Sequence, residues 1–156
     1  MSRTTPATLA LDKAGVAYAL ATYDYDSGAE RVGLQAAEAL GAPPGEVLKT
    51  LMVKADGKPV CVILASDREV SMKKLAAAVG AKSAEMMKPA DAERMTGYRV
   101  GGVSAFGQKR IVPTVIDADA AALLQAFVNA GQRGLQARLV PADLVRALGA
   151  TVAAIS

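Results

Sequence analysis

A glycine-rich stretch in the second half of the chain, residues 97–117, is the first candidate for chemistry. It carries glycine at positions 97, 101, 102 and 107. Glycine lets a backbone approach a ligand closely and turn its N–H groups toward it, which suits a phosphate or a developing oxyanion. The spacing and the missing Lys-Ser/Thr ending exclude a Walker loop. A glycine-rich turn without a ligand is the other interpretation that these residues leave open.

Two basic side chains stand where they could act on a ligand. Lys49 lies in the apolar segment VLKTLMV, so its ammonium group either faces solvent or enters a cavity. In a cavity it could hold a carbonyl or ribose oxygen, or polarise an ester. Arg133 lies in the short turn GQRG and could reach a phosphate, although a surface hairpin explains it equally well.

Histidine is absent from the 156 residues. This absence removes the commonest general base and the commonest metal ligand. It excludes a Ser-His-Asp or Cys-His mechanism and a Cys/His zinc site, and we expect neither a metal nor a cofactor. The single cysteine, Cys61, cannot form an internal disulfide, which agrees with a reducing compartment. Its apolar neighbours predict a small core residue and not a nucleophile.

Charge is distributed unevenly along the chain, whose net charge is +3. Acids outnumber bases before residue 48, whereas the segment from 97 to 142 carries two acids, Asp117 and Asp119, against the bases Arg99, Lys109, Arg110, Arg133 and Arg138. A basic second half suits a phosphate-bearing partner, and solvated surface charge is the alternative. No window approaches the roughly 18 apolar residues of a membrane helix, and an early charge argues against a secretory signal. We therefore expect a cytoplasmic protein.

Turn and periodicity signals predict short helices and strands. Helices are expected at 6–15, 30–40, 72–79, 88–95 and 141–148, and strands at 18–25, 47–55, 59–65, 112–116 and 151–155. The Asp56-Gly57 pair is the strongest hairpin signal, and a second hairpin is expected around 131–134. The segment 118–127 is ambiguous between helix and strand. This pattern predicts one α+β domain, 1–156, around a mixed, curled sheet.

Three blocks of sequence, in this order and spacing, resemble the YbaK/EbsC family of aminoacyl-tRNA deacylases: VLKTLMV, TGYRVGGVSAFGQKRIVPTVID and FVNAGQRGLQARLVPADL. These proteins are relatives of the editing domain of bacterial prolyl-tRNA synthetases. The resemblance implies an α+β domain with a mixed, barrel-like sheet flanked by short helices. It also implies hydrolysis of mischarged tRNA in trans. Cysteinyl-tRNA for proline is the substrate of the YbaK branch, and alanyl-tRNA for proline is that of a sister branch.

The resemblance assigns roles residue by residue. Lys49 matches a lysine near the substrate carbonyl and terminal ribose, and Gly101 and Gly102 match a loop whose backbone holds the aminoacyl ester. The other residues expected to bind substrate are Tyr23, Ser104, Phe106, Asn129 and Gln136. The residues expected to contact the tRNA are Arg99, Lys109, Arg110 and Arg133. The chain departs from the family at Ala105, Asn129 and Gln136, where proline, serine and Asp or Glu are usual.

Such a site can work without histidine, because an aminoacyl ester is already activated and needs positioning, oxyanion stabilisation and a nucleophile. The nucleophile is water or, with a cysteinyl substrate, the substrate's own thiol. A non-catalytic module that binds aminoacyl-tRNA or a synthetase through the same pocket is the alternative. A third option, an RNA-binding protein without a pocket, fits poorly with an aromatic content of 4%. The expected partners are the acceptor end of a mischarged tRNA and an aminoacyl-tRNA synthetase, and neither a membrane nor DNA.

Overall fold

The computed structural model describes residues 4–25 and 32–156. The start of the helix predicted at 30–40 lies outside these residues. Along the chain the elements are α1 (Pro6–Lys13), β1 (Ala19–Thr22), α2 (Val32–Leu40), the 3-10 turn η1 (Pro44–Glu46), β2 (Leu48–Ala55), β3 (Lys58–Ala65), α3 (Met72–Ala78), β4 (Ala84–Met86), α4 (Pro89–Thr96), β5 (Thr114–Asp117), α5 (Ala118–Ala121), β6 (Ala126–Gln132), β7 (Leu135–Leu139), α6 (Pro141–Leu148) and β8 (Thr151–Ala153).

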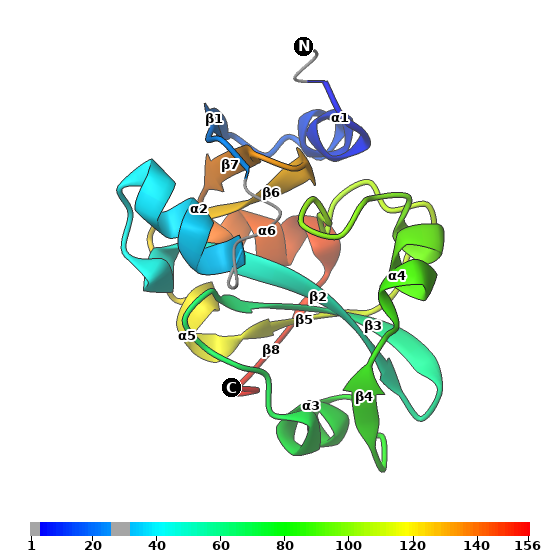
Figure 1. Cartoon of the computed structure of the whole chain (residues 1–156). Coiled ribbons are helices and arrows are strands. Elements are labelled where there is room, and N and C mark those ends of the chain that lie inside the picture. The colour runs from blue at the N-terminus through cyan, green and yellow to red at the C-terminus, as the bar shows by residue number, and fades with distance from the viewer. Residues whose placement is uncertain (1–3, 26–31) are drawn as a thin grey trace.

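The strands form two sheets. The larger is mixed, with the order β4-β2-β3-β5-β8; β3, β5 and β8 run parallel to one another, and β2 pairs antiparallel with β3 and β4. The smaller is antiparallel, with the order β1-β7-β6. A bridge between Val47 and Phe127 joins them. Figure 1 shows the smaller sheet and α1 at the opposite end of the molecule from α3 and β4. The predicted α+β class and mixed sheet are confirmed.

Local signals set most of the element boundaries. Thr5 caps α1 in a capping box with Thr8, with proline at the first turn. Asp56 and Gly57 both adopt positive φ, at 50° and 79°, in the turn between β2 and β3, which is the geometry of a tight hairpin. Left-handed Gly97 and Gly149 end α4 and α6. The ambiguous segment after residue 117 divides into the short helix α5 and the strand β6.

β3 is the buried centre of the larger sheet. Its residues Val62 and Leu64 pack with Leu75 of α3 and with Ile155 on one face, whereas Ile63 belongs to the core shared with α1 and α6. Because both faces of β3 are covered, its sequence is continuously apolar and does not alternate. β4 was not predicted, because a three-residue edge strand leaves no periodicity to detect. No helix in the described parts of the chain is long and apolar enough to cross a membrane.

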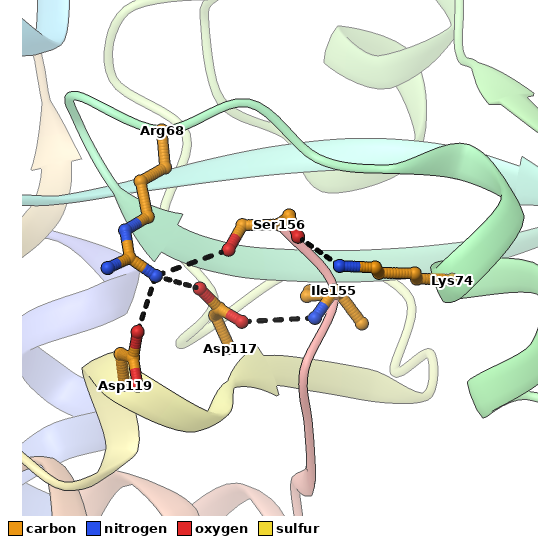
Figure 2. A network of polar contacts seen from close by, with 6 residues as sticks. All are labelled: Arg68, Lys74, Asp117, Asp119, Ile155 and Ser156. Carbon is orange, nitrogen blue, oxygen red and sulfur yellow. Dashed lines mark hydrogen bonds and ion pairs between the residues drawn. The ribbon is translucent and has the colours of Figure 1, made fainter.

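A polar network fastens the C-terminal segment to the end of β5 (Figure 2). Asp117 is buried, and its Oδ1 accepts a hydrogen bond from the Ile155 amide at 3.0 Å. Arg68 Nη1 lies 3.6 Å from Asp117 Oδ2 and also bonds Asp119. Lys74 Nζ donates to the Ser156 carbonyl at 2.9 Å. Asp117, the last residue of the glycine-rich stretch, therefore holds β8 and the chain after it against the sheet.

Candidate functional site

A cavity of about 270 Å³ is lined by both sheets, α2, the start of α4 and the glycine-rich loop. It brings together five of the predicted site residues, which come from four distant parts of the chain: Tyr23, Lys49, Gly101, Asn129 and Gln136. The rest of its wall is mainly apolar and includes Met52, Met86, Met87, Ala92 and Val103. A concave, apolar pocket with a few polar groups is the usual form of a small-molecule site.

Lys49 lies on β2, opposite Leu64 of β3, and is half-buried in the wall of the cavity. Of the two interpretations of its strand position, the structure therefore favours the cavity. Among the described residues of the lining, Lys49 is the one cation, and none is an acid. Lys49 therefore brings a positive charge to the wall of this cavity.

The glycine loop is bound to the β6–β7 hairpin through two consecutive carbonyl groups. The Val100 carbonyl accepts a hydrogen bond from Arg133 Nε at 2.8 Å, and the Gly101 carbonyl accepts one from Asn129 Nδ2 at 3.0 Å. Asn129 Oδ1 in turn accepts from the Gly131 amide at 2.8 Å. Asn129 therefore uses both ends of its amide to hold the loop and the hairpin together.

Gly101 and Gly102 allow this close contact. A Cβ on Gly101, whose φ is +91°, would lie 2.5 Å from Tyr25 Oη, and a Cβ on Gly102 would lie 2.9 Å from the Arg133 backbone nitrogen. Gly101 lines the cavity, whereas Gly102 does not. The Gly102 amide donates to the Arg99 carbonyl at 2.8 Å, so it is engaged within the loop. Of the two glycines predicted to be catalytic, the structure brings only Gly101 to the cavity.

Ser104 and Phe106, both predicted to bind substrate, are buried away from the cavity lining. Ser104 Oγ accepts from the Phe106 amide at 3.1 Å. The Phe106 side chain joins the larger core, and its carbonyl accepts a hydrogen bond from the Tyr98 hydroxyl at 2.5 Å. The physical reason is that the loop turns inward after residue 103 and packs on α1, where Gly107 meets the Pro6 carbonyl. These two residues shape the loop from within the protein.

The four basic residues predicted to contact tRNA lie beside different elements. Arg133 bonds the Val100 carbonyl and Arg99 directly precedes Val100, but neither lines the cavity. Lys109 is exposed, and its aliphatic stem packs against Gly97. Arg110 lines a different cavity, of about 600 Å³, beside the β2–β3 turn and the end of α3.

Tyr23 and Gln136 are the other polar groups of the cavity. Burial raises the pKa of the Tyr23 hydroxyl, and a hydrogen bond with Gln136 opposes that rise. Gln136 is buried, and its Oε1 has no hydrogen-bond partner in the described structure. An unpartnered acceptor in the wall of a cavity marks a place where a ligand donor would be favoured.

Sequence reasoning did not identify Tyr25 or the methionines as part of the site. Tyr25 packs on Gly101, and the Arg133 guanidinium carbon lies 5.0 Å from the centre of its ring. Met86 and Met87 both line the cavity, and Met86 is 49% exposed. No sequence signal separates such methionines from core residues. Cys61 is a core residue as predicted, and burial raises the pKa of its thiol to about 12.

Known proteins with related sequences match most of this chain. The sequence profile described as the aminoacyl-tRNA editing domain matches residues 30–147. EbsC of Enterococcus faecalis, a candidate Cys-tRNA(Pro)/Cys-tRNA(Cys) deacylase, is 39% identical over 106 residues, which are 67% of this chain and 65% of EbsC. A proline–tRNA ligase of Acidithiobacillus ferrooxidans is 32% identical over 87 residues, covering 56% of this chain and 15% of the ligase. This chain therefore spans less than two thirds of either relative's length.

The fold is also found among solved structures. A candidate trans-editing enzyme for prolyl-tRNA synthetase superposes with a TM-score of 0.85 at 22% identity, and the match covers 99% of each chain. At that identity the likeness concerns the fold alone. The matched profile contains the Lys49 strand, the glycine loop and the β6–β7 hairpin, which are the parts that build the cavity. The chain belongs to the aminoacyl-tRNA editing domain family.

Proposed function

We propose that this protein is a trans-editing hydrolase that deacylates mischarged aminoacyl-tRNA, with cysteinyl-tRNA for proline as its main substrate. The observation that carries the proposal is the convergence of Lys49 and Gly101 in one apolar cavity of a chain that belongs to an editing family. The deacylase name of EbsC supports the cysteinyl substrate. The methionine-rich wall is compatible with this substrate, because methionine adapts to gaps of irregular shape and cysteine behaves as a small apolar side chain.

In this mechanism the protein positions an ester that is already reactive. The Lys49 ammonium group holds the terminal ribose and the ester carbonyl, and the Gly101 amide stabilises the negative charge that develops on the carbonyl oxygen. Water then attacks the carbonyl carbon, or the substrate's thiol forms a C–S bond to it, which gives a cyclic thioester. In either route the C–O bond to the ribose breaks, and a proton of the water or of the thiol passes to the departing ribose oxygen. Neither route needs a histidine.

The remaining residues surround this centre. Tyr23 and Gln136 contact the aminoacyl side chain, and Asn129 holds the loop. Arg99, which directly precedes Val100 of the cavity lining, receives the phosphates of the acceptor end, and Lys109 and Arg110 contribute positive potential further out. A synthetase that hands over the tRNA is the proposed protein partner, and the cytoplasm is the proposed site of action.

One observation favours a second function, the non-catalytic capture of charged tRNA or docking on a synthetase. Gln136 is a neutral amide, and none of the described residues that line the cavity is an acid. Such a pocket could bind the aminoacyl end without any protein group to activate water.

Deacylation of Cys-tRNA(Pro) and Ala-tRNA(Pro) by the wild type, Lys49→Ala and Lys54→Ala tests the proposal. Lys54 lies on the same strand but outside the cavity lining. Its variant therefore controls for the loss of one positive charge and for the effect of alanine in this strand. We expect Lys49→Ala to lose about 10²–10³-fold in rate, the size seen when an oxyanion contact is removed, and Lys54→Ala to keep full activity. Binding of charged tRNA without any acceleration over buffer would establish the capture module instead. Equal rates for the two variants would remove the role of Lys49.

A further inference from the structure

Arg133 points back onto the glycine loop. Its Nε donates to the Val100 carbonyl at 2.8 Å, and its guanidinium carbon stacks 5.0 Å from the centre of the Tyr25 ring. The side chain is half-buried. A side chain that serves only to bind phosphates at the protein surface needs neither of these contacts.

The hydrogen bond to Val100 fixes the direction of the next amide. The Val100 carbonyl and the Gly101 N–H belong to one planar trans peptide unit, in which the two groups point in opposite directions. Because Arg133 holds the carbonyl toward the hairpin, the Gly101 N–H is directed away from the hairpin. Gly101 itself lines the cavity, and no hydrogen bond within the described residues uses its N–H.

Asn129 fixes the following peptide unit in the same manner. It holds the Gly101 carbonyl, so the Gly102 N–H turns away from the hairpin and donates to Arg99. Two consecutive units are thus clamped by two hairpin side chains. The second unit's amide is engaged inside the loop, and the first unit's amide is left for a ligand.

Tyr25 contacts both the loop and Arg133. Its hydroxyl lies 2.5 Å from the place where a Cβ on Gly101 would stand, and its ring centre lies 5.0 Å from the Arg133 guanidinium carbon. Tyr25 therefore contacts both Gly101 and Arg133, the residue that orients the Gly101 amide.

We propose that Arg133 is a positioning residue: through the Val100 carbonyl it aims the Gly101 amide at the ester carbonyl, and Tyr25 holds its guanidinium in place. This inference rests on the proposed function, because the ester is the proposed ligand. Lysine keeps the charge of arginine but lacks the planar group that can bond Val100 and stack on Tyr25 together. A phosphate contact would tolerate that exchange, whereas the positioning role does not.

Steady-state deacylation by Arg133→Lys, with Arg146→Lys on α6 as the matched control, separates the two roles. We expect Arg133→Lys to lower kcat by about 10²-fold, with KM within about twofold of wild type and the salt dependence of KM unchanged. We expect Arg146→Lys to behave as wild type. A raised KM with a shallower salt dependence and an intact kcat would overturn the inference and make Arg133 a phosphate contact.

A measurement without substrate keeps the inference distinct from the proposed function. In ¹H–¹⁵N spectra, the Gly101 amide resonance should move in both Arg133→Lys and Tyr25→Leu, while Arg146→Lys leaves it in place. Circular dichroism confirms that each variant is folded. A Gly101 resonance that stays unchanged in both Arg133→Lys and Tyr25→Leu would refute the positioning role even in an active enzyme. A wild type that deacylates no substrate would refute the proposed function, whatever the spectra show.

Discussion

Replacing Gly102 by alanine tests whether the glycine loop and the β6–β7 hairpin must touch backbone to backbone. Gly102 is not among the residues with positive φ, so alanine can adopt its backbone conformation. The obstacle to alanine is the lack of space for its methyl group. An added Cβ would lie 2.9 Å from the Arg133 nitrogen and 3.1 Å from the Gln132 carbonyl carbon, and backbone atoms on both sides can give way only if the loop and the hairpin separate.

Two effects of opposite sign determine how much Gly102→Ala changes the free energy of unfolding. Alanine reduces the conformational freedom of the unfolded chain, which alone would raise the free energy of unfolding by about 0.4–1 kcal/mol. Forcing a methyl group into a packed contact costs about 1–3 kcal/mol. Gly45 is the matched control, because it lacks positive φ and a Cβ there meets nothing within 4 Å. We expect Gly45→Ala to be neutral or stabilising, and Gly102→Ala to be less stable than Gly45→Ala by about 1–3 kcal/mol.

Urea unfolding of both variants gives the stability difference, and deacylation rates give its consequence. Separation of the loop from the hairpin would loosen the bonds from Arg133 to Val100 and from Asn129 to Gly101, so Gly102→Ala should also lose activity. Equal unfolding midpoints for the two variants would refute the close-contact argument. A destabilised Gly102→Ala with wild-type kcat would show that the contact serves folding alone.

Two further changes probe groups that support the loop and the sheet. Burial raises the pKa of Tyr98 from 10.0 to about 12, so its contribution to stability is complete below pH 10 and is lost as the pH rises toward 12. Tyr98→Phe should lower the free energy of unfolding at pH 7 by about 1–3 kcal/mol, because the Phe106 carbonyl loses its donor, and should flatten the decline above pH 10; an unchanged alkaline profile would contradict this. Asp117→Ala should cost about 1–3 kcal/mol in urea unfolding because the buried Ile155 amide loses its acceptor, while Asp117→Asn, which can still accept that bond, should cost less. The Arg68–Asp117 ion pair adds little to the free energy of unfolding, since the Arg68 side chain is 45% exposed and solvent screens the pair. If Asp117→Asn were as unstable as Asp117→Ala, the charge of Asp117 would contribute more than its hydrogen bond to Ile155.

The loop also shows why the two interpretations of the glycine-rich stretch are not exclusive. Gly102 and Gly107 are required because neighbouring backbone lies where a Cβ would stand, and that is a structural reason. Gly101 has such a reason as well, in Tyr25, and in addition lines the cavity. Tight packing of the loop is what holds the Gly101 backbone in place at the cavity wall.

Features that depend on a few neighbouring residues were determined by the sequence alone. The capped start of α1 at Thr5, the Asp56-Gly57 turn and the glycine ends of α4 and α6 follow from backbone preferences and local hydrogen bonds. The sequence predicted the start of α1 at residue 6, the turn, and the span of α6. The absence of histidine likewise narrowed the chemistry before any fold was known. The order of three sequence blocks indicated the family, but not which of their residues meet.

Tertiary structure decided which of the candidates share a site. Strand alternation alone left Lys49 free to face either solvent or a cavity, and the packing of the two sheets with the glycine loop formed a cavity whose lining includes this residue. Ser104 and Phe106 went to the core and Arg110 to another cavity, although all three are close to Gly101 in sequence. The contacts of Arg133 with Val100 and of Tyr25 with Gly101 join residues that are far apart along the chain. No local pattern records such contacts, because they exist only once the hairpin and the loop have packed together.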